Sequence, residues 1–313
     1  LPLSRGLGDV YKRQKLMFHD QYAFFSSTSK LMQAHFKDFY QFIVDSPYLR
    51  KDPFIVELGS NDGILLKNFS DANYNHLGIE PSENVAKVSN LHGVKTINEF
   101  FSLNTANQII AKNGKADVFM AANVMCHIPN IKDVVNGIKA ILKDTGVLIF
   151  EDPYLGDVIE KNSYDQIYDE HVFIFSAHSV KYLFNLFDLE LIDAIHQETH
   201  GGSMRYIICH KGTYPVSKNL NRLLDKEKLL GLNNIKHISL FKNNVEKSKR
   251  DLLNLLHTIS NNSKTIAGYA ATSKSTTILN YCGIGPELIQ FISDTTPLKI
   301  GKVSPGMHIP ILS

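Results

Sequence analysis

The 313-residue chain is poor in cysteine, in net charge and in long apolar runs. Its three cysteines, Cys126, Cys209 and Cys282, stand far apart and form no Cys-x-x-Cys pair. This spacing argues against a disulfide framework and against a zinc site built from clustered cysteines. It favours a reducing, cytoplasmic setting.

Charge and hydropathy exclude two kinds of partner. The 33 Lys and Arg nearly balance the 31 Asp and Glu, for a formal net charge of +2. A protein that captures nucleic acid electrostatically needs a basic stripe, so we expect no nucleic-acid partner. No segment approaches the roughly 20 consecutive apolar residues of a membrane span, so we expect no membrane partner either. The 43% hydrophobic residues still allow a large core, which excludes a disordered chain.

From residue 51 to residue 212, short apolar runs alternate with amphipathic stretches. This order predicts an α/β fold with a Rossmann-like parallel sheet that is covered by helices on both faces. We expect the last two strands to pair as an antiparallel hairpin. The expected strands cover residues 53–58, 76–79, 93–97, 117–122, 146–151, 189–195 and 204–210, and the expected helices 64–69, 82–91, 105–112, 131–142 and 179–187.

Different patterns flank this region. Residues 15–50 read as an aromatic-rich helical segment, and residues 213–262 as a charged, leucine-periodic helical connector. Residues 263–313 start again with a strand, a small-residue loop and a helix from Thr276, which predicts a second, incomplete Rossmann-like domain. Residues 1–14 show neither helical nor strand periodicity, and we expect them to be a non-native leader.

A small-residue loop, Gly59-Ser-Asn-Asp-Gly63, follows the first expected strand. Such a loop lets backbone amides approach a ligand at the carboxyl edge of a parallel sheet. Glu80 ends the next strand, where its carboxylate can accept hydrogen bonds from a ribose diol. NAD and S-adenosylmethionine both carry this diol, but a dinucleotide needs Gly-x-Gly-x-x-Gly for its pyrophosphate.

The residue types in the loop therefore favour S-adenosylmethionine. Asp62 would repel a pyrophosphate but suits a sulfonium cation. The predicted cofactor-binding residues are Gly59, Asn61, Asp62, Gly63, Glu80 and Asn123. The structural alternative is an ordinary turn in which Asp62 caps a helix. Asn123 and His127 follow the fourth expected strand and would overlook the same edge, unless Asn123 only caps a turn and His127 is a surface residue.

The segment Tyr164-Asp-Gln-Ile-Tyr-Asp-Glu-His171 concentrates two tyrosines, three acids and one histidine. A histidine is easily poised for proton transfer near neutral pH, and a neighbouring carboxylate can orient it. A phenol can donate to an oxygen on which negative charge develops. Together they could abstract a proton next to a ketone, although a polar loop that covers the sheet is the structural alternative.

Two further features suggest anion binding. Lys274 and Ser275 stand at the expected start of a helix, where hydroxyls, backbone amides and a cation suit a diphosphate. The residue order Gly-Lys-Ser/Thr of a Walker loop is absent there. Arg205, after the Gly201-Gly202 turn, could meet a phosphate, but a surface position is the simpler interpretation.

Taken together, these motifs resemble the sugar C-methyltransferases of deoxysugar biosynthesis, which methylate C3 of nucleotide-linked 4-ketosugars. The resemblance runs from about Phe18 to Ile311 and is most specific in two segments, Tyr168-Asp-Glu-His171 and Pro305-Gly-Met-His-Ile-Pro-Ile311. It also covers the segments 22–29, 57–63, 78–81, 123–130, 152–154 and 200–202. It implies an S-adenosylmethionine-dependent enzyme that acts on a nucleotide-linked ketosugar.

The resemblance also implies residue roles. His171 would remove the C3 proton, and the residues that hold or polarise the ketosugar would be Tyr22, Tyr168, Glu170 and His127. Lys274 and Ser275 would hold the diphosphate. The family's zinc module, with its paired cysteines, would precede this chain, so we expect no metal within it. Two alternatives stay open: methylation of a hydroxyl or amine on a related sugar nucleotide, and a non-catalytic protein that binds nucleotide sugars or NAD. No oligomeric state is predicted.

Overall fold

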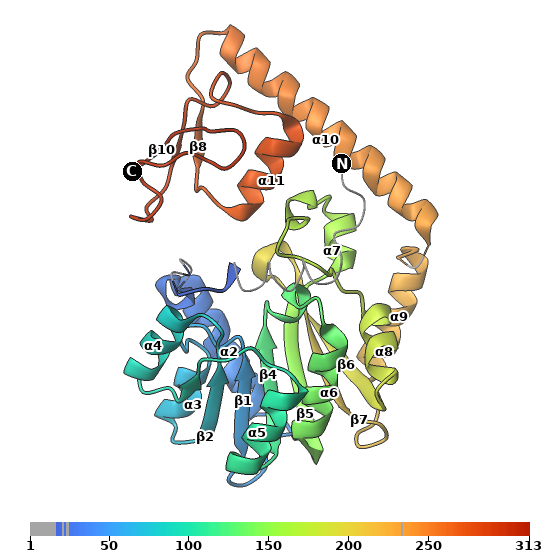
Figure 1. Ribbon diagram of the computed structural model, residues 1–313. Helices are drawn as coiled ribbons and strands as arrows, with labels where there is room; N and C mark the ends of the chain where they lie inside the picture. Colours follow the sequence, from blue (N-terminus) through green and yellow to red (C-terminus); the bar gives the residue numbers. More distant parts are fainter. Residues whose placement is uncertain (1–16, 21, 23–24, 233) are drawn as a thin grey trace. The chain divides into compact units, whose positions relative to one another are not determined.

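The computed structural model describes residues 17–20, 22, 25–232 and 234–313 (Figure 1). The expected leader lies outside these residues, as do Ala23 and Phe24. The chain divides into two compact units. The first unit runs to Tyr154 and resumes over Val172–Glu227, and the second unit combines Leu155–His171 with Lys228–Ser313. The segment 155–171 thus belongs with the C-terminal part of the chain, which no pattern in the sequence indicated.

A seven-stranded sheet forms the centre of the first unit, in the order β3-β2-β1-β4-β5-β7-β6. Strands β1 to β5 pair in parallel, while β7 runs antiparallel to both β5 and β6. This confirms the predicted Rossmann-like α/β fold. The strands are β1 (Phe54–Leu58), β2 (Asn75–Ile79), β3 (Thr96–Ile97), β4 (Ala116–Ala122), β5 (Leu142–Pro153), β6 (Leu189–Gln197) and β7 (Ser203–His210).

Helices pack on both faces of this sheet, so its inner strands bury both faces. All of β1 is buried, with alternate residues in two separate cores. One core holds Val56 with residues of α5, α6 and α8, and the other holds Ile55 with residues of α2 and α3. The helices are α2 (Lys30–Val44), α3 (Leu66–Asp71), α4 (Glu83–Leu91), α5 (Leu103–Asn113), α6 (Ile131–Ile141), α8 (Ala177–Asn185) and α9 (Lys218–Leu229).

Short 3-10 turns complete the connections. They are η1 (Ser26–Thr28), η2 (Met125–His127), η3 (Tyr164–Gln166) and η4 (Thr199–Gly201). Turn η2 directly follows β4 at the carboxyl edge of the first unit's sheet. Turn η3 belongs to the second unit.

The second unit contains a three-stranded parallel sheet in the order β10-β9-β8. Its core gathers Leu256, Leu279, Ile292 and Ile309. Helix α11 begins at Ser273 rather than at the expected Thr276, because Thr272 and Ser275 form a reciprocal capping box. The elements are α7 (Leu155–Glu160), α10 (Ile235–Asn261), β8 (Ala267–Tyr269), α11 (Ser273–Cys282), β9 (Phe291–Ser293) and β10 (Ile311–Leu312).

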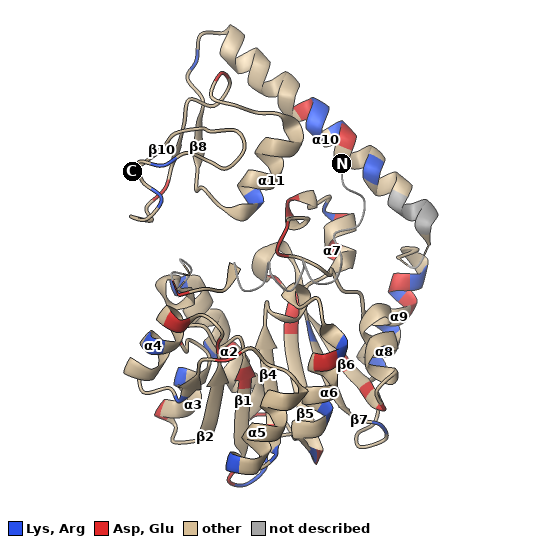
Figure 2. Cartoon of the chain, in the orientation of Figure 1, with Lys and Arg blue, Asp and Glu red and all other residues tan. Residues whose placement is uncertain are grey.

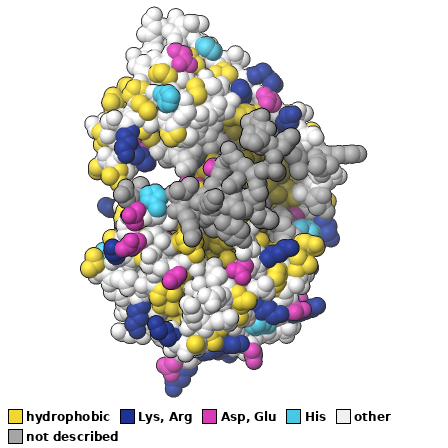
Figure 3. All heavy atoms as spheres, in the orientation of Figure 1, with side chains coloured by type: hydrophobic (Ala, Val, Ile, Leu, Met, Phe, Trp, Pro, Cys, Tyr) yellow, Lys and Arg dark blue, Asp and Glu magenta, His cyan; other side chains and the backbone are white. Residues whose placement is uncertain are grey.

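Charged residues of both signs are mixed over the described surface. Basic and acidic positions both occur along the middle of α10 (Figure 2). On the face drawn in Figure 3, Lys and Arg side chains are interspersed with Asp and Glu. Within the described ranges, no helix combines the length and the apolar character that crossing a membrane requires.

Candidate active site

The glycine loop after β1 has a backbone that few residues tolerate. Gly59, Asn61 and Gly63 all have positive φ angles, of 66°, 49° and 85°. A Cβ atom on Gly59 would lie 2.3 Å from Cγ2 of Val124. Glycine is therefore required here both by the left-handed backbone and by the close approach of the residue after Asn123.

Glu80 is a buried carboxylate at the end of β2, with 4% of its surface exposed. Its Oε2 accepts the backbone N–H of Asn61 at 3.0 Å, and its Oε1 accepts that of Ser82 at 2.8 Å. Burial raises the pKa of Glu80, and these amides oppose the rise. Because each carboxylate oxygen has a second lone pair, both can still accept hydroxyl groups of a ribose.

Asp62 is tied to the segment that precedes α2. Its Oδ2 accepts the hydroxyl of Ser27 at 2.6 Å and the Ser27 backbone N–H at 3.0 Å. The backbone N–H of Ser26 donates to Oδ1 of Asn61 at 2.9 Å. Oδ1 of Asp62 is buried without a hydrogen-bond partner among the described atoms. A positively charged or hydrogen-donating group would satisfy it, so the residues around this loop fit S-adenosylmethionine.

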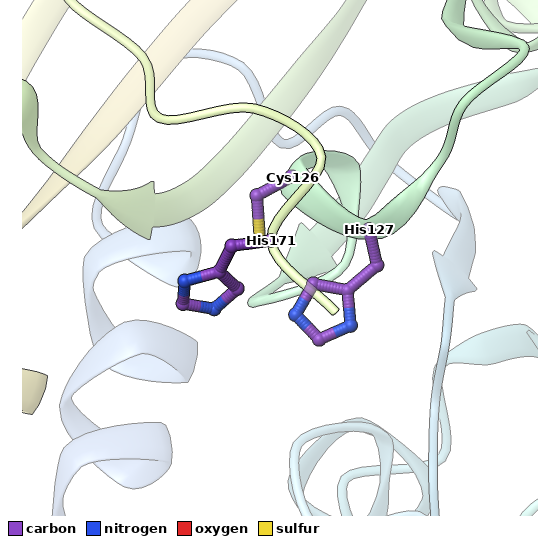
Figure 4. A group of neighbouring side chains, drawn as sticks. All are labelled: Cys126, His127 and His171. Atoms are coloured by element: carbon purple, nitrogen blue, oxygen red, sulfur yellow. The ribbon is translucent and has the colours of Figure 1, made fainter. Parts of the chain in front are cut away.

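Asn123 and His127 lie at the same edge, after β4. Asn123 has a left-handed φ of 56°, and its backbone N–H donates to the carbonyl of Glu151 at 2.7 Å. His127 ends the η2 turn, from which Cys126 and His127 project side by side (Figure 4). The figure also draws His171, a residue of the second unit.

Tyr22 reaches this edge from the N-terminal segment. The Phe18 ring lies 5.5 Å from the Tyr22 ring and stacks on His127 at 6.1 Å. The side-chain amide of Asn84, on α4, donates to the Tyr22 carbonyl at 2.8 Å. The structure thus brings Tyr22 and His127 together through Phe18.

Glu151 and Arg205 form a buried ion pair that the sequence did not reveal. Nε of Arg205 donates to Oε1 of Glu151 at 2.6 Å, and Nε2 of His35 lies 2.6 Å from Oε2. Burial would raise the pKa of Glu151, but the His35 hydrogen bond and the Arg205 charge hold it below its usual range. The guanidinium lies over the rings of Phe39 and Phe42. With 4% of its surface exposed, Arg205 is not a surface residue, and that interpretation was wrong.

Asp152, the next residue along β5, has a raised pKa, whereas that of Glu151 is lowered. Burial raises its pKa to about 8, although its Oδ2 accepts the Cys126 backbone N–H at 3.0 Å. The charge of Glu151 adds to the rise. The protonated carboxyl of Asp152 therefore fastens the η2 turn, which carries His127, to the end of β5.

His171, in the second unit, has its imidazole held by a backbone carbonyl. Its Nδ1 lies 2.7 Å from the carbonyl oxygen of Gln166. A carbonyl only accepts, so Nδ1 carries the hydrogen and the lone pair of the neutral ring lies on Nε2. Burial lowers the pKa of His171, and the positive charge of Lys274 lowers it further, against the hydrogen bond to Gln166. The imidazole is therefore a neutral base at physiological pH.

Tyr168 and Lys274, two of the predicted site residues, interact with His171. The Tyr168 ring lies 4.1 Å from the imidazole, centre to centre. Burial raises the pKa of Glu170, and the charge of Asp169 adds to the rise. Burial lowers the pKa of Lys274, against the attraction of Asp165. These groups all belong to the second unit, so its fold alone assembles them.

Ser275 has a local structural partner. Its hydroxyl donates to the carbonyl of Thr272 at 2.8 Å and accepts the backbone N–H of Thr272 at 2.9 Å. Its own N–H donates to the Thr272 hydroxyl. Ser275 thus caps α11, whose first turn also carries Lys274.

The predicted residues form two groups, one in each unit. The first unit gathers the predicted cofactor residues with Tyr22 and His127 at the carboxyl ends of β1, β2 and β4. The second unit gathers Tyr168, Glu170, His171, Lys274 and Ser275. Sequence reasoning missed the contribution of Ser26 and Ser27 to the cofactor loop. Their segment, 22–29, entered only through the family resemblance, which gave a role to Tyr22 but none to Ser26 or Ser27.

The strand order, the glycine loop after β1 and the acid after β2 define a class I S-adenosylmethionine-dependent methyltransferase. Family models agree: one for a methyltransferase domain matches residues 29–194, and one described as the C-methyltransferase C-terminal domain matches residues 198–313. The C-methyltransferase NovU of Streptomyces niveus is 31% identical over 293 residues, which cover 93% of this chain and 70% of NovU. The chain belongs to the C-methyltransferase family.

Among solved structures, S-adenosylmethionine-dependent methyltransferases are similar to part of this chain at low sequence identity. One from Anabaena variabilis is 13% identical with a TM-score of 0.47, over 66% of this chain and 96% of that one. Another from Clostridium acetobutylicum is 15% identical with a TM-score of 0.45, over 58% of this chain and 96% of that one.

Proposed function

We propose that this enzyme methylates C3 of a nucleotide-linked 4-ketosugar, with His171 as the base that removes the C3 proton. The observation that carries the proposal is the imidazole of His171, neutral and hydrogen-bonded through Nδ1 to Gln166. A histidine in this tautomer can accept a proton on Nε2. The charge of Lys274 favours return of the neutral form after each turnover.

A proton next to a carbonyl is acidic only when the enolate oxygen is stabilised. The C3–H electrons then move into the enolate, and the proton passes to Nε2 of His171. Tyr168, which packs on His171, and His127 are the proposed donors to the sugar oxygen. We assign Tyr22 and Glu170 to holding the sugar, and Lys274 and Ser275, at the start of α11, to the diphosphate.

S-adenosylmethionine, when bound, supplies an electrophilic methyl group, which the C3 carbanion takes up with release of S-adenosylhomocysteine. For this cofactor we propose that Glu80 holds the ribose hydroxyls and that Gly59 and Gly63 allow close backbone approach. Asn61, Asp62 and Asn123 complete the set. Methyl transfer in line needs positioning more than further acid–base chemistry.

Hydrogen exchange distinguishes this reaction from methylation of a hydroxyl or amine, which needs no enolate. The enzyme is incubated with a 4-ketosugar nucleotide in deuterated water without methyl donor, and deuterium at C3 is followed by NMR. We expect exchange with the native enzyme and none with His171→Gln. Absence of exchange in the native enzyme, with bound substrate demonstrated, excludes the C-methylation mechanism.

The cofactor assignment has its own test. Calorimetric titrations with S-adenosylhomocysteine and with NAD compare the two ribose-containing ligands directly. We expect binding of S-adenosylhomocysteine only, because the loop lacks the third glycine and carries Asp62. Binding of NAD alone would reverse the assignment and favour a non-catalytic nucleotide-binding protein.

A further inference from the structure

The base proposed above is presented from irregular backbone rather than from a strand or a long helix. His171 follows the η3 turn by five residues, and its Nδ1–H is held by the carbonyl of Gln166, the last residue of that turn. The backbone N–H of His171 donates to the carbonyl of Tyr168 at 3.0 Å. The position of the imidazole therefore depends on where the η3 turn lies.

The η3 turn is fastened by its first residue, Tyr164, which is 8% exposed. The Tyr164 hydroxyl lies 3.7 Å from Sγ of Cys282, and its ring packs edge-on against Tyr281 at 5.5 Å. Both partners are at the end of α11. The hydroxyl also interacts with Ser248 of α10. One side chain thus joins the turn to two helices of the same unit.

The partner Tyr281 is itself held from α10. Its hydroxyl donates to Oε1 of Glu246 at 2.6 Å. Nζ of Lys249 donates to the Tyr281 carbonyl at 2.7 Å and lies 4.8 Å from the centre of its ring. Tyr281, against which the Tyr164 ring packs, is thus itself held by Glu246 and Lys249 of α10.

The first turn of α11 interacts electrostatically with His171. Lys274, in the first turn of α11, disfavours the protonated imidazole, and Lys274 is in turn attracted by Asp165 of the η3 turn. Between the η3 turn and His171, the charged residues are Asp169 and Glu170. One helix thus sets both the place and the charge environment of the base.

We propose that Tyr164 is the residue that positions His171, because it fastens the η3 turn, and with it the Gln166 carbonyl, to α11. The inference rests on the proposed role of His171 as the base. Tyr164 itself is a positioning residue and takes no part in proton transfer. Without it, the Gln166 carbonyl no longer selects the Nδ1–H tautomer, and the imidazole moves away from Lys274.

The test compares Tyr164→Leu, which removes ring and hydroxyl, with Tyr164→Phe, which removes the hydroxyl alone. In protein labelled with ¹⁵N-histidine, the tautomer and the pKa of His171 are read by NMR, with His171→Gln used to assign its signals. We expect Tyr164→Leu to lose the Nδ1–H tautomer and to raise the pKa of His171 towards its ordinary value. This readout needs no substrate, so it stays valid if the proposed substrate is wrong.

Turnover provides the second readout. Because a small misplacement of a reacting group is costly, we expect kcat to fall about tenfold to a hundredfold in Tyr164→Leu, with KM unchanged. The Tyr164→Phe variant should fall roughly threefold, as for loss of one hydrogen bond. The acid limb of the kcat–pH profile should move to higher pH in both. Affinity for S-adenosylhomocysteine should not change, because the cofactor residues belong to the first unit.

Tyr182→Leu is the matched control, since Tyr182 is 70% exposed on α8. It should leave tautomer, pKa and kcat unchanged. The proposal is overturned if folded Tyr164→Leu keeps the native tautomer and pH profile. Should Tyr164→Leu fail to fold, as judged by circular dichroism, Tyr164→Phe decides alone, and a native tautomer and profile in that variant overturn the proposal.

Discussion

The two units hold their reactive groups by different means. In the first unit, the proposed cofactor residues stand at the ends of neighbouring parallel strands, where backbone amides hydrogen-bond to Glu80, as those of Asn61 and Ser82 do. In the second unit, the proposed base His171 follows the 3-10 turn Tyr164–Gln166, which packs against side chains of α11. The first arrangement follows from sheet topology, and the second depends on packing between distant segments. Substitutions in the two units should therefore have separable effects.

The largest expected effect is that of His171→Gln on turnover. Loss of a general base costs about 10²- to 10⁴-fold in rate, so we expect kcat to fall by about 10³-fold. Steady-state assays of methyl transfer measure it. Calorimetry with S-adenosylhomocysteine should give a native affinity, because no cofactor residue is changed. Weakened cofactor binding would instead assign His171 a structural role and remove the separation between the units.

Arg205→Ala tests what holds the first unit together. The substitution leaves Glu151 buried without its cation, so the free energy of unfolding should fall by about 3–5 kcal/mol. Urea unfolding at neutral pH measures the change. The native pair is fully present there, and its contribution is lost as the pH falls through the lowered pKa of Glu151. Lys87→Ala, which breaks an exposed pair with Glu83, is the control and should cost much less; equal costs would contradict the prediction.

Gly59→Ala should weaken cofactor binding and leave proton removal by the proposed base unchanged. The new Cβ would lie 2.3 Å from Val124 on a backbone with φ of 66°, so affinity for S-adenosylhomocysteine should fall about tenfold or more. Gly93→Ala has a similar φ of 82° but open space around the Cβ, and it isolates the effect of the clash. Deuterium exchange at C3, without methyl donor, should continue in Gly59→Ala. Exchange lost together with cofactor binding would show that the units do not act separately.

The smallest expected effect concerns Asp152. Its pKa of about 8 in the folded chain exceeds that of the unfolded chain, so the folded state retains a proton over this range. The free energy of unfolding should therefore fall as the pH rises, by about 1 kcal/mol between pH 7 and 8. Asp152→Asn, which is neutral throughout, should lack this slope. The free energy of unfolding is measured by urea unfolding at pH 7 and at pH 8. If it changes equally with pH in the native protein and in Asp152→Asn, Asp152 is already ionised at pH 7.

The sequence predicted the features that local patterns encode. Apolar runs predicted the strands of the first unit. The assignment of the glycine loop and Glu80 to the cofactor stays a prediction. The contacts that were missed join residues far apart in the chain. His35 and Glu151 are 116 residues apart, and Ser27 and Asp62 are 35 apart. Such pairs leave no periodicity, so neither the burial of Arg205 nor the role of Ser27 could be inferred. The early start of α11 was missed because Ser275 replaces the more usual Glu or Gln of a capping box.

The discontinuity of the second unit has a consequence for synthesis on the ribosome. Tyr164 and its partner Cys282 are 118 residues apart. At about 5–20 residues per second, the segment 155–171 waits roughly 6 to 24 s after its translation before that partner exists. Most of the first unit's sequence is complete well before then. The segments of the first unit can therefore pack together before Tyr164 has its partner on α11, so the proposed base is positioned later than the proposed cofactor residues.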